Sequence, residues 1–349
     1  MERDVCLNVG FSPKKQSAFG NGLTDTDITL AHPFIGNDIV DRTIDKYDNK
    51  EEYGKGHEYP TTQNNLVSDT KASRNFEASS LILGWAFAFA CGQVTTIQPD
   101  DVGSPNVYEH TFKLSDIDNP AVGIQLPATT IVEKLNSFQQ KKFRDMVVSE
   151  ISLSGKTKEQ LKLGMQLVGS GHWEANSMVL PALAQVSFLR MADVVITVGA
   201  KDISAEAMEF EFSHKNNLAE DKGYHPGSGY LIADDSNSPQ IRGHLVCEKR
   251  ETALKFKVLL NDSDLENFAE NNLEKAISIV AEGNVIENTY KHKLELNFPK
   301  AFLKFTKVGV DGSLYVYDVE VSVAWDDTEN TPFIAKVINN VPSYLVAAS

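Results

Sequence analysis

Four residues near the middle of the chain, Ser154-Gly155-Lys156-Thr157, have the residue types of a phosphate-binding loop. In such a loop, backbone N–H groups and a lysine hold the phosphates of a nucleotide. The motif also requires a glycine five residues before Gly155, and that position is Glu150. The flanking residues alternate in polarity as in a hairpin, so we predict that Gly155 and Lys156 turn the chain and bind no phosphate.

A histidine and a carboxylate lie close together at His172-Trp173-Glu174, after a Gly-Ser-Gly turn. A metal or acid–base site needs more ligands than these two, so we predict the polar end of a strand. Other histidines are scattered and form no His-x-x-x-His pair: His110, His214, His225, His244 and His292. Three aspartate pairs fall at turns and lack the pattern of a calcium loop: Asp100-Asp101, Asp234-Asp235 and Asp326-Asp327.

The remaining candidates for chemistry are a serine and three cysteines. Ser228 lies in a Gly-Ser-Gly triplet, which lacks the Gly-x-Ser-x-Gly spacing of a nucleophile elbow. Cys6, Cys91 and Cys247 are far apart, form no Cys-x-x-Cys pair and do not indicate an oxidising compartment. We therefore predict no catalytic, cofactor-binding or metal-binding residues, and we expect a protein that is not an enzyme.

The charge of the chain is its unusual bulk property. With 349 residues, 42% apolar and 23% charged, the chain has the size of about two domains, or one large one, and an ordinary composition. Its formal net charge is −15, which argues against tight binding to nucleic acid phosphates or to an anionic membrane. This charge is explained either by solubility or by a surface that must not hold a polyanion, such as a channel for nucleic acid.

The first 73 residues are polar and show little periodicity of either kind. They predict a long arm or loop system, of the sort that orders against a neighbouring molecule in an assembly. The first residues, MERDVCLNVG, contain no hydrophobic signal region, so we expect no secretion by that route. We also predict no transmembrane segment.

The elements that must support any function are organised around Ser79 to Cys91, the most apolar run in the chain. We interpret it as a short buried helix, capped by Ser79 or Ser80 and ended by Gly92, although periodicity alone leaves a strand possible. Residues 93–97 then predict a strand. Further elements in the first half are strands at 107–114 and 121–133, a short helix at 134–146, a hairpin at 147–167 and a strand that ends the apolar residues 179–198.

The second half repeats this organisation, with a helix–strand unit near 263–281. Asp262 or Ser263 can cap a helix that runs to about Lys275, and strands follow it. The other elements are strands at 208–212, 240–248 and 252–260, a loop at 214–239 and a hairpin signal at Asp311-Gly312. The last strand is the clearest, with one apolar face made of Tyr315, Tyr317, Val319, Val321, Val323 and Trp325.

The order of these blocks resembles the tail tube (major tail) proteins of long, non-contractile-tailed bacteriophages. The resemblance covers roughly residues 74–328. It rests on Arg74 before the apolar helix, the strand VTTIQP, the segments YEHTFKL and TTIVEK, and the block FRDMVVSEISLSGKTKEQLKLGMQLVGSG. ISAEAMEFEFSHKNNL, IRGHLVCEKRETALKFKVLL, LENF, KLELNFPK and the strand from DG to WDD fit the later half.

This resemblance implies a mainly β fold with minor α, in two antiparallel sandwich-like or barrel-like tube domains, each flanked by a short helix. It divides the chain into an N-terminal arm at 1–73, a first domain at 74–200 and a second domain with a C-terminal tail at 201–349. Strands of neighbouring subunits would line a ring, and rings would stack into a tube. Three two-domain chains, or six chains, would close each ring.

The resemblance further implies a virion protein that assembles in the host cytoplasm. Its expected partners are itself and the tape measure, tail terminator and tail-tip proteins, with no cofactor and no membrane. The arm within 1–73 and the loop at 214–239 are candidates for contacts between rings, or plain disordered surface. DNA would pass through the lumen without specific binding, repelled by acidic residues such as Glu209, Glu211, Asp318 and Glu320.

Two other functions remain as alternatives. A tail-completion or baseplate-hub protein would form one ring of the same fold. A β-rich carbohydrate-binding or adhesion module would need an exposed aromatic platform. Trp85 and Trp325 fall in apolar strips that predict burial, which leaves Trp173 as the candidate for such a platform.

Overall fold

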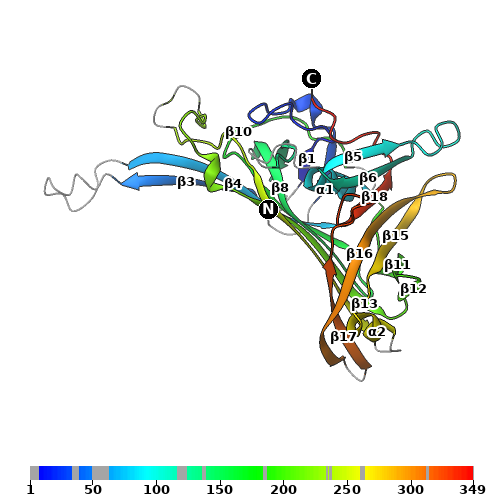
Figure 1. The fold of residues 1–349 in the computed structure, drawn as a ribbon. Coiled ribbons are helices and arrows are strands. Elements are labelled where there is room, and N and C mark those ends of the chain that lie inside the picture. Colours follow the sequence, from blue (N-terminus) through cyan, green and yellow to red (C-terminus); the bar gives the residue numbers. More distant parts are fainter. Residues whose placement is uncertain are drawn as a thin grey trace, which may run out of the picture.

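The computed structural model describes residues 8–33, 39–48, 63–115, 124–135, 139–183, 187–232, 235, 238–259, 264–311 and 314–348. Within them the chain is mainly β with minor α, as predicted, and its paired strands are antiparallel (Figure 1). The helices are α1 (Ser80–Cys91) and α2 (Asp264–Glu270). The strands are β1 (Asn8–Phe11), β2 (Leu30–Pro33), β3 (Asp41–Asp48), β4 (Gln63–Glu77), β5 (Gly92–Ile97), β6 (Tyr108–Leu114), β7 (Thr129–Lys134), β8 (Gln140–Lys156), β9 (Lys162–Val168), β10 (Trp173–Ala175), β11 (Val194–Val198), β12 (Lys201–Asp202), β13 (Ala207–Leu218), β14 (Cys247–Leu259), β15 (Lys275–Glu287), β16 (Tyr290–Asp311), β17 (Leu314–Val323) and β18 (Ile334–Asn339).

Helix α1 forms where the most apolar run of the sequence predicts it. The Ser79 hydroxyl accepts a hydrogen bond from the Ile82 N–H at 3.5 Å, which caps the start of the helix. Gly92 ends it with φ 83°, a left-handed conformation that favours glycine. All 12 residues of the helix are buried, because apolar side chains surround it on every side.

Strands cover α1 on all sides. The helix packs on β8 and on β5, β6, β16 and β18. Its one indole, that of Trp85, donates a hydrogen bond to the Ser12 carbonyl at 2.8 Å, so this buried polar group is satisfied. Phe87 lies between Phe112 of β6 and Phe212 of β13, with ring centroids 6.3 Å and 6.0 Å away. The helix is therefore the centre of the core rather than a surface element.

The largest sheet runs in the order β3-β4-β9-β8-β13-β14-β17-β16. A second sheet leaves it through β16, which also pairs with β15 and β18, and continues to β11 and to β6 and β5. A third leaves through the start of β8 and includes β7, β1, β2 and β10. The long strands β8 and β16, of 17 and 22 residues, thus join the sheets.

One part of the largest sheet extends beyond the body of the molecule. Strand β3 and residues 63–71 of β4 form a two-stranded ribbon, blue in Figure 1, which we call the β3–β4 ribbon. Among the described strands, β3 pairs with β4 alone. Residues 63–66 of β4 have no second strand beside them either, because β9 pairs with β4 from Lys71 onward.

The expectation of an irregular segment at 1–73 is wrong for the described residues, which include β1, β2, β3 and most of β4. Strand β3 has exposed or partly exposed positions throughout. A strand that buries neither face needs no alternation of apolar and polar residues, so its sequence carries no periodic signal. The residues at 1–7, 34–38 and 49–62 lie outside the described ones.

The predicted helix at 134–146 is also wrong. Residues from Gln140 onward belong to β8, which pairs with β7 and β10. Asp145 interrupts the strand pattern with φ 58°, and its buried carboxylate accepts hydrogen bonds from Ser170 Oγ at 2.8 Å and from the Gly20 N–H at 2.7 Å. Pairing with distant strands outweighs the helical spacing of the apolar residues here.

Smaller differences occur at the ends of elements. The hairpin β8–β9 turns after Lys156 rather than at Gly155, and α2 ends at Glu270 rather than Lys275. Residues 240–246 belong to no strand, so the strand expected at 240–248 begins only at Cys247. Strand β13 also extends to Leu218, into the loop expected at 214–239. The capping candidates Asp262 and Ser263 lie outside the described residues.

The second helix–strand unit, α2 followed by β15, is present as predicted, and so is the hairpin β16–β17. A single hydrophobic cluster contains residues of both halves of the chain, among them Phe87, Phe212 and Phe298. The division into two domains near residue 200 stays a prediction. None of the helices in the described parts of the chain is long and apolar enough to cross a bilayer.

Candidate assembly surface

The residues that resemble a phosphate-binding loop lie in strand β8 and its hairpin. A Cβ atom at Gly155 would approach Phe210 Cε1 to 2.5 Å and Leu161 Cδ2 to 2.6 Å, so this position packs tightly against the core. The left-handed turn residue is Lys158, with φ 72°. Gly155 is thus a packing residue, and the prediction that the segment belongs to a hairpin is confirmed.

The group at 172–174 makes contacts that tie strands together. The Trp173 ring contacts the Arg42 guanidinium, 5.0 Å from its centroid, and the Lys141 ammonium, 4.7 Å from its centroid. Glu174 pairs with Arg144 at 2.9 Å. Burial lowers the pKa of His172, which favours its neutral form. The predicted strand end is confirmed as β10, and Trp173 is covered by two cations rather than open as a platform.

The histidines do not converge on a ligand set. Among the described residues, no group of three or more His, Cys, Asp or Glu side chains is placed to hold a metal ion. Burial lowers the pKa of His214 to about 3 and that of His110 to about 4, so both are neutral core residues. His225 and His244 stack with ring centroids 5.2 Å apart.

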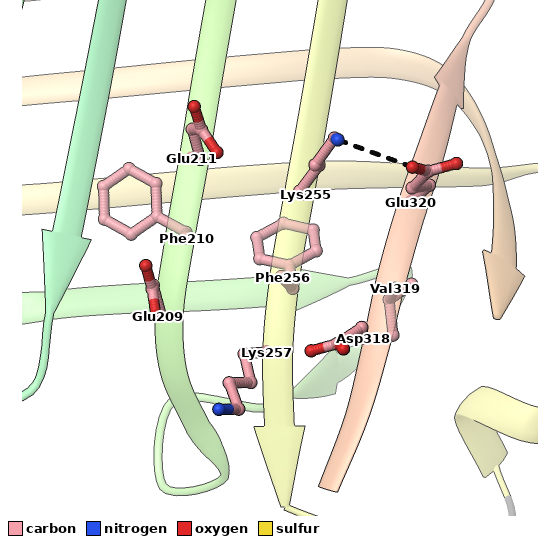
Figure 2. Close-up of a pocket in the computed structure, with 9 residues that line it drawn as sticks. All are labelled: Glu209, Phe210, Glu211, Lys255, Phe256, Lys257, Asp318, Val319 and Glu320. Atoms are coloured by element: carbon pink, nitrogen blue, oxygen red, sulfur yellow. Dashed lines mark ion pairs between the residues drawn. The ribbon is translucent and has the colours of Figure 1, made fainter. Parts of the chain in front are cut away.

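The four acidic residues suggested for a lumen lie together on one face of the largest sheet. Figure 2 shows Glu209 and Glu211 on β13, and Asp318 and Glu320 on β17, with β14 between them. They line a shallow hollow of about 390 Å³. Alternate residues on each of these strands face the core, as Phe210 and Phe256 do, so the strand period places the charges on the outer face.

Lysines of β14 separate these carboxylates. Lys257 lies opposite Glu209 on one side and Asp318 on the other, and Lys255 lies opposite Glu211 and Glu320. The Lys255 ammonium is 3.4 Å from the Glu320 carboxylate (Figure 2). Opposite charges on neighbouring strands attract, so the face is a ladder of alternating charge rather than a purely acidic surface.

The same alternation extends across the sheet. One row crosses seven strands in the order Glu77, Lys162, Ser154, Glu211, Lys255, Glu320 and Lys304. A second row contains Ser73, Gln166, Glu150, Lys215 and Glu251. We call this outer surface of the largest sheet the polar face. The alternation of apolar and polar residues along each strand predicts such an outer face, but it does not predict which charges become neighbours.

The two segments expected to contact a neighbouring subunit meet at the base of the β3–β4 ribbon. Gln240, in the connection between β13 and β14, bonds to β4 on both sides of Val67: its N–H donates to the Leu66 carbonyl and its carbonyl accepts from the Ser68 N–H, each at 2.8 Å. The Tyr224 hydroxyl donates to the Ser68 carbonyl at 2.8 Å. Tyr224 and Gln240 of this connection are therefore bonded to the base of the ribbon.

Arg242 holds this junction together. Its side chain is 3% exposed, and it binds the Asp69 carboxylate at 2.6 Å and the Gly169 carbonyl at 2.8 Å. Its guanidinium also stacks on the Tyr224 ring, 4.8 Å from the centroid. Lys71 pairs with Asp69 and Glu220 nearby. Sequence analysis missed this cluster, since a single arginine in a long loop gives no signal of its partners.

The electrostatics of the junction follow from these contacts. Burial raises the pKa of Asp69, but the hydrogen bond and charge of Arg242 outweigh it, so the net shift is downward and the carboxylate stays ionised. Burial raises the pKa of Tyr224 to about 12, so its hydroxyl remains a donor. The junction is an ion-pair network with fixed charges, and it sets the direction in which the ribbon leaves the body.

The expectation that Trp325 is buried is wrong. Trp85 is 1% exposed, as predicted, but Trp325 is 49% exposed and lies beyond the last residue of β17. It borders a hollow of about 530 Å³ between the first half of β14 and the end of β6. The apolar face of β17 continues past the point where the sheet covers it, which leaves Val323 only partly covered.

No family model and no curated protein matches this chain.

Proposed function

We propose that this protein is a structural component of a bacteriophage virion, which self-assembles into stacked rings and forms the tail tube of a long, non-contractile tail. In this proposal the tube is the conduit for genome DNA, and it contacts the tape measure, tail terminator and tail-tip proteins. The chain performs no catalysis and uses no cofactor. Rings consist of three two-domain chains or of six chains.

The β3–β4 ribbon is the observation that carries the proposal of self-assembly. Two strands that are largely exposed on both faces, as β3 and residues 63–66 of β4 are, are marginally stable alone in water. The ribbon nevertheless leaves the body in a defined direction, held by Arg242 and Gln240 at its base. Its exposed apolar side chains include Tyr47 and Leu66, each 48% exposed. A neighbouring subunit would cover them and pair the open edge of β3.

The polar face supports the proposed passage of DNA. Tight binding to phosphates needs a cluster of unpaired basic side chains. On this face Lys255 lies between Glu211 and Glu320, and Lys257 lies between Glu209 and Asp318. The net charge of −15 adds long-range repulsion of a polyanion. Such a surface suits a lumen wall along which DNA slides without sticking.

One observation favours a second candidate, a carbohydrate-binding or adhesion module. Trp325 is half-exposed beside a hollow that Thr252 and Ser115 also line, and an exposed indole near polar groups is a feature of sugar sites. A single indole is a weaker argument than the ribbon, because it requires no second copy of the chain. The tail-completion or hub alternative shares the fold and differs in stopping at one ring.

Sedimentation velocity over a concentration series tests the proposal. A tube protein is expected to pass from monomer to rings and then to a broad, growing population of long particles. A hub protein would stop at one ring species. A chain that stays monomeric at every concentration, also with tail-tip proteins added, would contradict both and favour the binding module. Adding double-stranded DNA at physiological salt should leave the sedimentation profile of the particles unchanged.

A further inference from the structure

We propose that the hollow beside Trp325 receives the β3–β4 ribbon of a second copy of this chain. The inference rests on the proposed function, since it names the surface on which that self-assembly depends. It is carried by three features of the described residues: an open strand edge, an apolar hollow beside it, and a projecting strand pair whose exposed groups match both.

The open edge belongs to β14. Strand β17 pairs with β14 from Leu254 to Leu259 and with no earlier residue of β14, and at the start of β14 Cys247 forms an isolated bridge with Ile124. Among the described strands, none runs along the same edge between Glu248 and Ala253. The opposite edge is paired with β13 over this whole length. Backbone groups on the open side can therefore accept an added strand, which is the geometry of β-augmentation.

The hollow lies next to this edge, on the inner side of the sheet. The inward positions of β14 are apolar at Leu254, Phe256 and Val258 but change to Thr252 and Arg250 toward its start. Here they line a cavity of about 530 Å³ instead of the core. Its apolar walls are Leu114, Ile124, Val323, Trp325 and Pro332. A strand added at the edge would place alternate side chains into this space.

The hollow also carries a positive charge. The Arg250 guanidinium donates hydrogen bonds to the Ser115 carbonyl at 2.7 Å and to its hydroxyl at 2.8 Å, and both acceptors are neutral. Among the ion pairs of the described residues, none joins Arg250 to a carboxylate. Glu248, at the margin, is already paired with Lys222. The site therefore favours a partner that brings both an apolar side chain and a carboxylate.

The β3–β4 ribbon has these groups. Tyr47 is 48% exposed and stands between the neighbouring positions Lys46 and Asp48 of β3. Asp45 and Asp48 have no cation partner among the ion pairs of the described residues, although Asp48 accepts a hydrogen bond from Gln63 Nε2 at 2.8 Å, and no described strand other than β4 pairs with β3. Tyr47 would pack beside Trp325, an aspartate would face Arg250, and β3 would pair with β14. A head-to-tail contact of this kind joins unlike surfaces, as a ring or a stack of rings requires.

The choice of a strand over a sugar follows from the backbone. An oligosaccharide would use the Trp325 ring and leave the β14 edge unpaired, whereas a strand uses both. A chain with a formal charge of −15 also has few sites at which its own acidic segments can dock, and Arg250, partly buried and without a carboxylate partner among the described ion pairs, is one of them.

Cross-linking between two tagged chains tests the inference. One chain carries Lys46→Cys on β3 and the other, of different length, carries Glu248→Cys beside the hollow, both in a Cys6→Ser background. Cys91 and Cys247 are buried, so they react slowly. The matched control replaces Glu248→Cys by Val285→Cys, at a site that is 54% exposed on β15. Mixed assemblies are treated with a short bis-maleimide, and products of mixed length are quantified.

The expected result is at least about tenfold more mixed product for the Glu248→Cys chain than for the control, because docking raises the local concentration of the two thiols. Assemblies that form normally but cross-link only at the control level would overturn the inference and leave the proposed function standing. If wild-type chains form no assembly at any concentration, the proposed function fails, and this inference fails with it.

Variants of Trp325 give an independent readout. Trp325→Ala is expected to raise the concentration needed for assembly at least about tenfold, and Trp325→Phe should restore most of it, since an aromatic anchor in a hollow is a typical hot spot. Far-UV circular dichroism and the melting temperature check that both variants fold. If cellohexaose quenches the emission that Trp325→Phe removes, and also prevents the cross-link, the hollow is a sugar site and the inference is overturned.

Discussion

Helix α1 and the β3–β4 ribbon differ in how much of their surface the rest of the chain buries. The helix has apolar side chains on every side, and strands of all parts of the chain enclose it. The ribbon is covered only at its base, where Ser68 and Thr70 of β4 are buried, and its side chains are exposed or partly exposed along β3. The comparison teaches that one chain buries the helix fully by itself but leaves most side chains of the ribbon exposed. Stability is concentrated in the helix, and association is expected at the ribbon.

The largest effect is expected from the buried ion pair near α1. Arg74 of β4 pairs with Glu133 of β7, and each side chain is 1% exposed. The Val40 N–H also donates to Glu133, at 3.3 Å. Glu133→Gln removes the charge that Glu133 places beside a buried arginine, which should lower the unfolding free energy by about 3–5 kcal/mol. Urea denaturation measures it.

The exposed pair of Lys255 and Glu320 on the polar face is the matched control for that variant. Glu320→Gln should cost less than about 1 kcal/mol, because water screens an exposed pair. Equal losses in the two variants would show that the structure misplaces Arg74 and Glu133 relative to the core.

Lowering the pH should reduce the unfolding free energy through two buried histidines of the core. Burial holds the pKa of His214 at about 3 and that of His110 at about 4 in the folded chain. The unfolded chain binds protons on both near the ordinary value of about 6.5. The unfolding free energy is therefore highest above that pH with respect to these two groups. It falls as the pH is lowered from about 6.5 toward 4, by about 1.4 kcal/mol per pH unit for each histidine.

Unfolding free energies measured from pH 7 to pH 4.5 check this expectation. His110→Gln removes one of these groups, so the slope between pH 6 and pH 5 should fall by about the 1.4 kcal/mol per pH unit that one histidine contributes. A slope that does not change in the variant would mean that His110 is protonated in the folded chain or titrates alike in both states.

Tight packing on α1 should make a single methyl group costly. A Cβ atom at Gly84 would approach the Tyr344 hydroxyl to 2.6 Å and Asn339 Nδ2 to 2.9 Å. Gly84→Ala should therefore destabilise the chain by about 1–3 kcal/mol, although alanine favours a helix over glycine. Adding Tyr344→Phe removes the nearest atom and should recover part of the loss. Additive losses in the double variant would argue against this contact.

Substitutions in the ribbon should change the unfolding free energy least and should impair assembly instead. Tyr47→Ser should change the unfolding free energy by less than about 0.5 kcal/mol, since Tyr47 is exposed. The same variant should assemble poorly in sedimentation velocity. Leu314→Ser, at an exposed position on β17, is the control and should assemble normally. Normal assembly of Tyr47→Ser would remove the ribbon from the proposed interface.

The same comparison explains what could be predicted from the sequence. Helix α1 was predictable with both caps, because Ser79 and Gly92 act locally and the apolar run between them is continuous. The apolar face of β17 was predictable from Tyr317 to Val321, because apolar and polar residues alternate there, but Tyr315 on the same face is 63% exposed. The ribbon was missed because a strand exposed on both faces has no period, and the helix predicted at 134–146 was wrong because β7 and β10 pair with that segment.

The proposed assembly surface was predictable only in part. The carboxylates Glu209, Glu211, Asp318 and Glu320 were recognised as outward-facing, but their lysine neighbours depend on the order of β13, β14 and β17, which no local pattern gives. Arg242 and Trp325 were missed or misplaced for a related reason. Their surroundings consist of residues far away in the sequence, such as Asp69 for Arg242 and Leu114 for Trp325.

Negative-stain electron microscopy of the purified protein over a concentration series tests the central claim most directly. The proposal predicts hollow, striated particles of constant width that lengthen with concentration, and end views from which three or six subunits per ring can be counted. Chains that remain single at every concentration, with the ribbon intact by mass spectrometry and with tail-tip proteins present, would contradict it.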